Sequence, residues 1–584
     1  MIDVLARARA WHDSDCDPDD QKELHALLAR AESGDAESRA ELEDRLRGPL
    51  EFGTAGLRGV VGAGESRLNT AVIVRAVYGV VTHLLATVPG AASRGIVIGC
   101  DARNRSHALA RAAVEVASAL KMKVHYLPGH SPTPLVAFAV KELGAAGGCS
   151  VTASHNPPEY NGLKVYLDRG AQLVPPDDAL IAERIAAAPS AKDIARGPID
   201  GPLVTDVTTI EASYIAALLQ LKVLPVPSES LSIAYTALHG VGERLTREMM
   251  GKAGFSRFVS VDEQAQPDGS FPTVTFPNPE EPKALTKVLE LGARHNVDLV
   301  LAQDPDADRL AVAVFDADRK PVVLSGNEIG VLLGHHVLVR DPQPSGDRHV
   351  VTTIVSSAQL GVIGRALGAH VSETLTGFKW IAKAALDRAQ SDGWRFMFGY
   401  EEALGYTIGG VTRDKDGLGA ALVMAELAAD AKSRGETVLD VLRKIRERYG
   451  LFVGRQRSFT LNGRGGAEKI QAVMARLRAE PPVTLGGQPI ESAWDLLRRV
   501  RTSITARPEP MEHFSPADVL IYTLAGGGRA AVRPSGTEPK VKLYLEIVEK
   551  LGPGEALETA TVRGNEQLDA LEKDLVTAAG LDHS

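Results

Sequence analysis

The sequence predicts a multi-domain protein of the α/β class: three related α/β domains, a C-terminal α+β domain and an N-terminal helical extension. Three observations carry this prediction. The length of 584 residues suits roughly three to five domains. A strand–loop–helix pattern occurs three times, and a different pattern follows about residue 450. With 44% apolar and 24% charged residues, each domain has an ordinary globular composition and can bury its own core.

Residues 1–50 are expected to be helical. Leu24, Leu27 and Leu28 recur at the spacing of one helix face. The stretch holds no group of residues typical of a catalytic site, so we expect it to pack as an appendage on the rest of the chain.

Three short apolar runs are each followed by a polar loop and a helical pattern. Such runs are typical of buried strands in parallel sheets. The predicted strands are 95–99, 231–235 and 350–355. The helices after them are expected at 107–120, 243–253 and 358–367. This recurrence predicts three related α/β domains.

Proline, glycine and small polar residues collect between these units and mark domain boundaries. The boundaries predicted from them are 1–50, 51–207, 208–322, 323–450 and 451–584. A long helical segment is expected over 417–447. Residues 541–547 alternate apolar and polar side chains, as a half-exposed antiparallel strand does.

Composition excludes several classes of protein. The net charge of −9 disfavours nucleic acid as the main partner, because binding to a phosphate backbone needs a basic surface. No window approaches the ~20 apolar residues of a membrane span, and the first residues lack signal-peptide features. Cys16, Cys100 and Cys149 form neither a disulfide framework nor a zinc motif. We expect a cytoplasmic protein without nucleic-acid or membrane partners; the oligomeric state stays open.

The first segment whose residues could take part in catalysis or binding is the polar loop around Ser154. Thr152, His155 and Asn156 flank this serine, and two prolines follow. Asn156 precedes a proline, which keeps it out of the helical region and restrains the loop. An ordinary polar turn, bonded to its own backbone, is the alternative. No Gly-x-Ser-x-Gly elbow surrounds Ser154, so a hydrolase triad is not supported.

The second segment carries Asp304, Asp306 and Asp308 directly after the apolar run 298–302. Ligands bind at the carboxyl ends of strands in open α/β sheets. Carboxylates at alternate positions point the same way and can converge on one hard cation such as Mg²⁺. Without a cation they would repel one another. A solvated acidic turn is the alternative, but such a turn needs no buried strand before it.

The third segment is the loop 533–540. Arg533 offers a planar fork for a phosphate, Ser535 and Thr537 add hydroxyls, and Gly536 lets backbone N–H groups approach an anion. A plain β-turn explains the glycine but not the surrounding Arg, Ser, Thr and Lys. The pattern favours phosphate binding.

A fourth, weaker signal pairs two short segments. Glu401 and Glu402 follow an apolar strand and suit recognition of sugar hydroxyl groups. Upstream, Gly377 precedes Phe378 and Lys379, whose ammonium group offers a charge. Paired acids on a surface loop are the alternative.

Together these segments resemble the α-D-phosphohexomutase superfamily, the phosphoglucomutases and phosphomannomutases, with the motifs in the family's order from about residue 50 to 550. The resemblance implies a four-domain phosphohexomutase architecture. The opening run 52–59 (Phe-Gly-Thr-Ala-Gly-Leu-Arg-Gly) is similar to a subgroup that contains bacterial phosphoglucomutases and animal phosphopentomutases.

The resemblance also implies roles for single residues. Ser154 is the phosphoserine carrier and, with Asp304, Asp306 and Asp308, holds one Mg²⁺ per chain. Lys164 is the general acid/base. The remaining catalytic residues are Arg58, for proton transfer or phosphate neutralisation, and His155 beside the phosphoserine. The substrate-binding residues are Arg309, Gly377, Lys379, Glu402, Leu404, Arg533, Ser535, Gly536 and Thr537.

The implied activity is the interconversion of a sugar 1-phosphate and 6-phosphate, glucose first, through a sugar 1,6-bisphosphate that also activates the enzyme. One departure opens alternatives. The family's sugar loop reads Gly-Glu-x-Ser-Gly-His, but here Leu404 replaces the serine and Tyr406 the histidine. Because a lost hydroxyl removes a sugar hydrogen bond, pentose phosphates and mannose phosphate stay open. A glucose-1,6-bisphosphate synthase and a non-catalytic sugar-phosphate-binding protein are further alternatives.

Overall fold

The computed structural model describes residues 3–53, 56–461, 466–503, 507–534, 540–552 and 554–582. The chain forms two compact units, which are described separately. Unit 1 comprises Met1–Ile329 and Phe378–Gly435, and unit 2 comprises Gly330–Gly377 and Glu436–Ser584.

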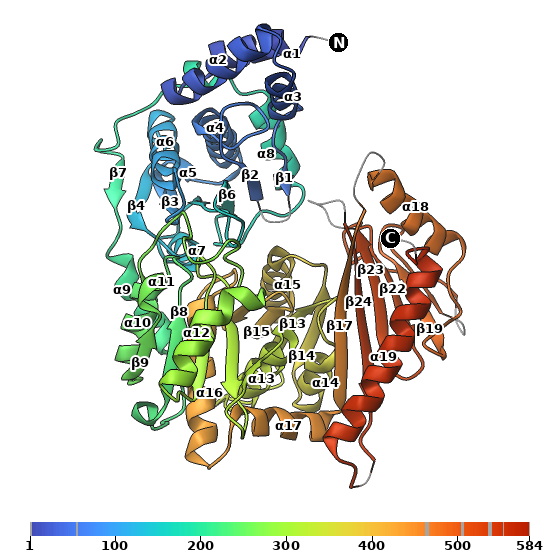
Figure 1. Ribbon diagram of the computed structural model, residues 1–584. Helices are drawn as coiled ribbons and strands as arrows, with labels where there is room; N and C mark the ends of the chain where they lie inside the picture. Colours follow the sequence, from blue (N-terminus) through green and yellow to red (C-terminus); the bar gives the residue numbers. More distant parts are fainter. Residues whose placement is uncertain are drawn as a thin grey trace. The chain divides into compact units, whose positions relative to one another are not determined.

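Unit 1 begins with the predicted helical extension (Figure 1). Its helices are α1 (Val4–Ser14), α2 (Pro18–Glu32) and α3 (Ala36–Arg45). Leu24, Leu27, Leu28 and Leu42 form a small core of their own, as their spacing predicts. The side chain of Asp17 accepts a hydrogen bond from the Asp19 amide at the start of α2, where proline occupies the first turn.

The first sheet of unit 1 is mixed. Its strands are β1 (Phe52–Gly53), β2 (Gly56–Val60), β3 (Ile96–Cys100), β4 (Val124–His130), β5 (Gly147–Val151), β6 (Tyr160–Leu167) and β7 (Val204–Asp206). They lie in the order β1-β2-β6-β5-β3-β4-β7. The central strand β3 runs parallel to β4 and β5, as the buried run 95–99 predicts, whereas β6 runs antiparallel to β5 and β2.

Helices flank this sheet (Figure 1). They are α4 (Thr70–Thr87), α5 (Ala91–Arg94), α6 (Ser106–Ala119), α7 (Thr133–Glu142) and α8 (Asp177–Ala186). The next helix, α9 (Ile210–Leu219), packs against α7 and against α10 (Glu243–Lys252). Among the described residues, only α4 is long and apolar enough to meet the length and hydropathy criteria of a membrane span, and 61% of it is buried. Because α4 packs against α6 and α8, we describe it as a core helix.

The second sheet of unit 1 follows the same plan. Its strands are β8 (Ser232–Thr236), β9 (Arg257–Ser260), β10 (Leu299–Ala302), β11 (Ala311–Phe315) and β12 (Pro321–Val323). Its helices are α10 (Glu243–Lys252), α11 (Asp262–Ala265) and α12 (Pro282–Arg294). The strand order is β12-β11-β10-β8-β9, with β8 parallel to β9 and β10 and with β11 antiparallel to β10.

The last part of unit 1 contains the antiparallel pair β15 (Arg395–Glu401) and β16 (Gly405–Ile408), with α15 (Phe378–Asp392) and α16 (Gly417–Ser433). The expectation of one helical segment over 417–447 is wrong. The helix stops at Ser433, Gly435 takes a left-handed φ of 71°, and Thr437 then caps a new helix. Glycine adopts this conformation without the strain that a Cβ atom causes.

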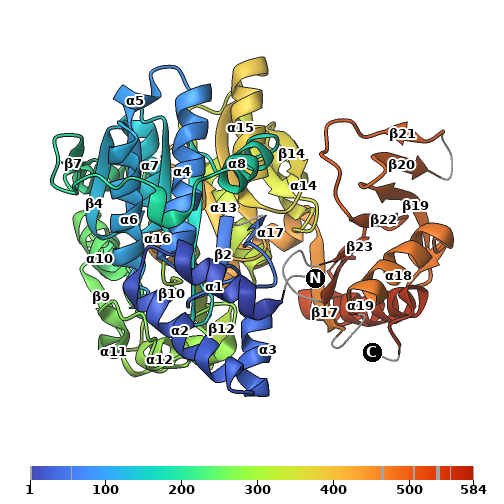
Figure 2. The same cartoon turned by 90° about the horizontal axis from the view of Figure 1, so that it is seen from above.

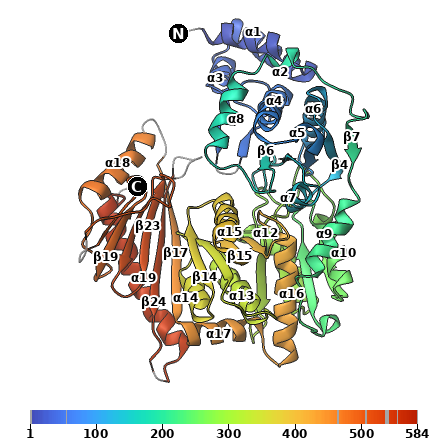
Figure 3. The same ribbon diagram turned by 180° about the vertical axis from the view of Figure 1, so that it is seen from behind.

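Unit 2 contains a parallel pair of strands and a large antiparallel sheet (Figures 2 and 3). The parallel strands are β13 (Arg348–Thr353) and β14 (His370–Thr374). The strands of the large sheet are β17 (Leu451–Thr460), β18 (Thr484–Leu485), β19 (Gln488–Asp495), β20 (Val500–Ser503), β21 (Glu509–Pro510), β22 (Leu520–Leu524), β23 (Arg529–Pro534) and β24 (Lys540–Glu549). The predicted strand 541–547 is β24, which pairs antiparallel with β17 and β23.

Five helices belong wholly or mainly to unit 2. They are α13 (Gly326–Val339), α14 (Gln359–Ala366), α17 (Val438–Tyr449), α18 (Gly466–Ala479) and α19 (Leu557–Ala579). Figure 2 shows α18 and α19 on one face of the large sheet, and they share a hydrophobic core with it. Helices and antiparallel strands thus form the expected C-terminal α+β part. The finer domain boundaries stay a prediction.

Candidate functional site

Three loops of unit 1 share one position in the fold. Each connects a strand to an antiparallel neighbour: residues 152–159 join β5 to β6, 303–310 join β10 to β11, and 402–404 join β15 to β16. Each also contains a residue other than glycine in the left-handed region, where such residues are uncommon. These are Ser154 (φ 51°), Ala307 (φ 57°) and Leu404 (φ 62°). Strained backbone of this kind clusters at functional sites.

Ser154 lies directly beside the acidic loop. Its Oγ donates a hydrogen bond to Oδ2 of Asp304 over 2.7 Å, and its amide donates to the hydroxyl of Thr152 over 2.8 Å. The residue is only 3% exposed. The structure therefore brings the predicted phosphoryl carrier and the predicted metal ligands together, although 150 residues separate Ser154 from Asp304.

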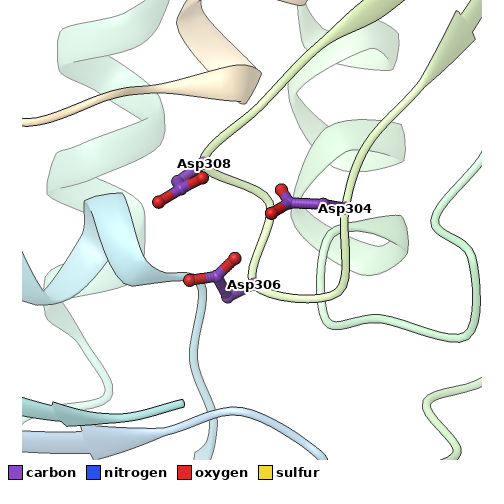
Figure 4. Close-up of side chains that lie close together, drawn as sticks. All are labelled: Asp304, Asp306 and Asp308. Carbon is purple, nitrogen blue, oxygen red and sulfur yellow. The ribbon is translucent and has the colours of Figure 1, made fainter. Parts of the chain in front are cut away.

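The three aspartates converge, as Figure 4 shows. One ligand atom from each lies within 4.8 Å of the others, and all three residues are fully buried. The Oδ1 atoms of Asp306 and Asp308 are buried without a hydrogen-bond partner, while both Oδ2 atoms accept from protein donors. Oxygen atoms left unpaired in this way fit one hard divalent cation, because such ions prefer carboxylate ligands.

The electrostatics of the trio follow from burial and mutual repulsion. Burial, followed by the charges of Asp306 and Asp308, raises the pKa of Asp304 well above its ordinary value. Burial also tends to raise the pKa of Asp308. The cations of Lys164 and Lys415 outweigh it, so that this pKa lies below the ordinary value.

Lys164 bridges two of the carboxylates from strand β6. Its Nζ lies 2.7 Å from Oδ2 of Asp306 and 2.6 Å from Oδ2 of Asp308. Burial by itself lowers the pKa of Lys164, but the two carboxylates outweigh it and hold the pKa above its ordinary value. In this arrangement Lys164 is a protonated donor.

Lys415 is a second cation at the trio, and sequence analysis missed it. Its Nζ lies 2.9 Å from Oδ2 of Asp308, and its amide donates to Asp414. Asp414 also accepts hydrogen bonds from Tyr166 and Gln172, which hold the segment in place. The available signal was the charged run 413–416 immediately before the almost wholly buried helix α16.

Arg58 and His155 make hydrogen-bond contacts with residues of the serine loop. Nη1 of Arg58 donates to the side chain of Asn156 over 2.8 Å, and burial lowers the pKa of Arg58 to about 10. Nδ1 of His155 lies 3.2 Å from Oγ of Ser154. Burial, followed by the nearby cations of Arg309 and Arg58, holds the pKa of His155 well below its ordinary value, so the imidazole is neutral.

Arg309 connects the metal loop to its surroundings. Its amide donates to Oδ1 of Asp304 over 3.0 Å, and its guanidinium pairs with Glu280 at 3.2 Å. The next residue, Leu310, donates its amide to the carbonyl of Leu404 over 3.1 Å. The 402–404 loop therefore lies against the metal loop.

The two residues that depart from the family's sugar loop are buried. Leu404 is 4% exposed, and Tyr406 is fully buried with its hydroxyl donating to the carbonyl of Gly326 over 3.2 Å. The ring of Tyr406 stacks on Tyr400 at a centroid distance of 6.4 Å. Glu402, before them, is half-buried. Only Glu402 of these residues offers the loop a charged side chain.

The other predicted substrate-binding residues lie in several places. Lys379 is in the first turn of α15 in unit 1, near the ring of Trp380, and burial lowers its pKa. Gly377 belongs to unit 2 and has a φ of 116°. Arg533, also in unit 2, is half-buried at the end of β23 opposite Lys542. Ser535, Gly536 and Thr537 lie outside the described residues.

A second missed residue, Arg103, holds the serine loop from beneath. Its side chain is fully buried, and its guanidinium donates to the backbone carbonyls of Ser154, Asn156, Pro157 and Tyr160. The polar run 101–106 after strand β3 was visible in the sequence, but nothing in it indicated which residue points toward the loop.

Comparison with known proteins identifies the family. The chain matches the phosphoglucomutase/phosphomannomutase family in four parts: alpha/beta/alpha domain I over residues 49–192, domain II over 212–317, domain III over 325–449 and the C-terminal domain over 505–550.

Individual relatives agree with this. A protein of Schizosaccharomyces pombe named a probable phosphoribomutase is 33% identical over 97% of this chain and 96% of its own length. A phosphoglucomutase of Staphylococcus epidermidis is 32% identical over 87% of this chain and 92% of its own. A solved phosphoglucomutase/phosphomannomutase family protein of Burkholderia thailandensis shares the fold, with a TM-score of 0.65 at 20% identity, over 90% of this chain and 97% of its own.

The chain therefore belongs to the phosphoglucomutase/phosphomannomutase family. The fold class and the resemblance predicted from the sequence are confirmed.

Proposed function

We propose that this phosphosugar mutase interconverts the 1-phosphate and 6-phosphate of a hexose, glucose first, with Ser154 as the phosphoryl carrier. The observation that supports this most directly is the 2.7 Å contact between Oγ of Ser154 and Asp304, at the edge of a buried carboxylate trio. A protein that only binds sugar phosphates has no need of a hydroxyl, three carboxylates and two lysines in one dry cluster.

The reaction proceeds by two phosphoryl transfers. The free sugar hydroxyl attacks the phosphorus of phosphorylated Ser154, the P–Oγ bond breaks, and a sugar 1,6-bisphosphate forms. The bisphosphate then reorients in the site, and Oγ of Ser154 attacks the phosphorus of its other phosphate. The bond between this phosphorus and the sugar oxygen breaks, the sugar monophosphate leaves, and Ser154 is phosphorylated again. In each transfer the proton of the attacking hydroxyl passes to the leaving oxygen. Because such transition states need charge neutralisation and alignment more than covalent chemistry, positioning is the main task of the protein.

The side chains around Ser154 divide this task. Asp304, Asp306 and Asp308 would hold one Mg²⁺, which supplies positive charge to the transferring phosphoryl group when it is bound. Lys164 and Lys415 are protonated beside the carboxylates and can donate a proton or neutralise phosphate oxygens. Lys164 can accept a proton only where a bound cation offsets the negative charge of Asp306 and Asp308. His155 is neutral and can share the Ser154 proton.

Substrate recognition is assigned to the residues around these groups. Arg58, Arg309, Lys379 and Glu402 lie in unit 1 and offer charges to a sugar phosphate. Arg533, with Ser535, Gly536 and Thr537, is assigned to the second phosphate from its sequence pattern alone. We infer small-molecule sugar phosphates as the partners, without nucleic acid or membrane, and the cytoplasm as the compartment, in line with three free cysteines.

One observation favours a second substrate class, the pentose phosphates. Leu404 and Tyr406 occupy the positions of the serine and the histidine of the family pattern, and both are buried. A site without those groups loses its discrimination between sugars. The relative named a probable phosphoribomutase, which matches almost the whole chain, agrees with this candidate.

The test is direct. Phosphate on Ser154 is sought by mass spectrometry of the purified chain, and turnover is measured with glucose, mannose, ribose and deoxyribose 1-phosphates, each with a trace of its bisphosphate. Ser154→Ala is expected to lose turnover by at least about 1,000-fold while it still binds glucose 1-phosphate. Substantial residual turnover would remove Ser154 from the mechanism. Net release of bisphosphate from a separate phosphoryl donor would favour a synthase instead.

A further inference from the structure

The N-terminal helices are joined to the serine loop through a short turn, residues 101–105, between β3 and α6. Two arginines of this turn point to opposite sides. Arg103 reaches the loop that carries Ser154, and Arg105 reaches helix α2. The turn therefore has one contact with the candidate catalytic loop and one with the segment expected to be an appendage.

Arg105 is held by helix α2 in a bidentate contact. Its Nη1 and Nη2 atoms lie 2.6 and 2.9 Å from the two carboxylate oxygens of Asp20, and Nη2 also lies 2.9 Å from Asp17. Asp20 is 1% exposed, and Thr70 of α4 donates to the same Asp17 oxygen over 2.6 Å. Bidentate arginine–carboxylate contacts fix geometry as well as charge.

The backbone of Arg105 adopts an uncommon conformation at this contact. Arg105 has a left-handed φ of 67° at the residue that caps the start of α6. A residue with a Cβ atom keeps such a conformation only where its surroundings impose it. Asp20 and Asp17 hold the side chain of Arg105, together with the hydroxyl of Thr70, which accepts from Nη2 over 3.2 Å.

Within the turn, buried hydrogen bonds connect Arg105 to Arg103. Oδ1 of Asp101 accepts from the Arg103 amide over 2.9 Å and from the hydroxyl of Ser106, the residue after Arg105, over 2.6 Å. Nδ2 of Asn161, from β6, donates to the same hydroxyl over 2.8 Å. A displacement of Arg105 is therefore expected to shift its neighbour Ser106 and the buried hydrogen bonds that Ser106 makes with Asp101 and Asn161.

Arg103 is the last link. Its guanidinium lies 2.6 Å from the carbonyl of Ser154, and it donates to three further carbonyls along the same loop. Since phosphoryl transfer depends on alignment, a small shift of this guanidinium changes the direction in which Oγ of Ser154 points.

We propose that Asp20 and Arg105 are positioning residues for the phosphoryl-transfer site, and that the N-terminal helices align the Ser154 loop through Arg103. The expected change in kcat rests on the proposed function of Ser154, whereas the expected change in the order of the 152–160 loop does not. The N-terminal segment, in which the sequence shows no catalytic group, thereby has a role in the reaction.

The experiment uses the full-length chain and two matched variants. Asp20→Asn removes the charge that holds Arg105. Glu41→Gln removes a carboxylate that pairs at 2.6 Å with Arg45 inside the same helical segment and has no contact with the turn. Hydrogen–deuterium exchange of peptides covering 152–160 is measured together with kcat and KM.

In Asp20→Asn we expect kcat to fall by about 10- to 100-fold with KM within about threefold of wild type, because alignment and not binding is lost. Exchange in 152–160 should become faster, while Glu41→Gln leaves both quantities unchanged. If Asp20→Asn does not fold, Arg105→Lys, which keeps the charge but not the bidentate contact, is expected to behave in the same way.

A double variant checks the path. If Asp20 and Arg103 act through one network, the loss of kcat in the double variant Asp20→Asn/Arg103→Lys should be smaller than the product of the losses in the two single variants. Exchange in 152–160 that matches Glu41→Gln would overturn the proposal, as would a loss of kcat with unchanged exchange. Full activity of Ser154→Ala would instead overturn the proposed function, and the exchange result would still decide the positioning role.

Discussion

Replacing Lys164 by methionine tests the link between charge and chemistry at the trio. Methionine has nearly the same length but no charge. The change removes the contacts of 2.7 and 2.6 Å to Asp306 and Asp308 and leaves Lys415 as a cation at 2.9 Å from Asp308. Because the Lys164 side chain is only 3% exposed, bulk water does not screen the charges that remain.

The magnitude follows from this burial. Removing one partner of a buried ion pair costs about 3–5 kcal/mol, since the remaining charges stay buried and unpaired. The carboxylates are then left with more negative charge, so we expect Mg²⁺ to bind about tenfold more tightly, which corresponds to about 1.4 kcal/mol. Turnover should fall by about 10²- to 10⁴-fold, the usual contribution of a proton-transferring side chain.

The assay is a denaturant titration of metal-free and Mg²⁺-saturated protein, together with the rate of glucose 6-phosphate formation. Lys252→Met is the control, because Lys252 pairs with Glu248 at the same 2.7 Å but with 51% of its side chain exposed. That surface pair is worth about 0.3–0.5 kcal/mol. Turnover of Lys164→Met within tenfold of wild type would exclude Lys164 from proton transfer, and unchanged Mg²⁺ affinity would refute the electrostatic coupling.

Two further predictions concern single buried groups. Burial raises the pKa of Asp15 to about 6, which is above its pKa in the unfolded chain. The protein is therefore most stable, with respect to this group, below about pH 4, where Asp15 is neutral. This contribution to the free energy of unfolding is lost as the pH rises from about 4 through about 6. Asp15→Asn should therefore stabilise the protein by about 1–3 kcal/mol at pH 7 and by almost nothing at pH 4; equal differences in thermal midpoint at both values would contradict this. Tyr406→Phe removes only the hydrogen bond to the carbonyl of Gly326 and should cost about 1–3 kcal/mol of stability, with turnover within about threefold of wild type. A 100-fold loss would show that the Tyr406 hydroxyl takes part in the reaction.

The sequence predicts the chemistry of each loop because that chemistry is local. Asp304, Asp306 and Asp308 follow a buried strand at alternate positions, and their repulsion indicates a cation without any knowledge of the fold. The strands 95–99, 231–235 and 541–547 are likewise readable from their own pattern, and the structure confirms them as β3, β8 and β24.

The sequence does not predict which distant groups meet at the trio. Lys415 reaches Asp308 only because the charged run before α16 lies beside the β10–β11 loop. The sequence of the 101–105 turn does not indicate that Arg103 points toward the serine loop and Arg105 toward α2. The helix break at Gly435 was missed because the apolar pattern continues on both sides of it.

By itself the sequence determined the class of fold and the family, and it predicts which residues carry a phosphoryl group or hold a cation, because strand pattern, turn chemistry and carboxylate repulsion act over a few residues. Only the tertiary structure decided that Tyr406 faces the core, that two lysines and not one neutralise the trio, and that an N-terminal helix holds the turn behind Ser154. Those outcomes depend on strand order and on burial, which bring together residues that are 80 or more positions apart.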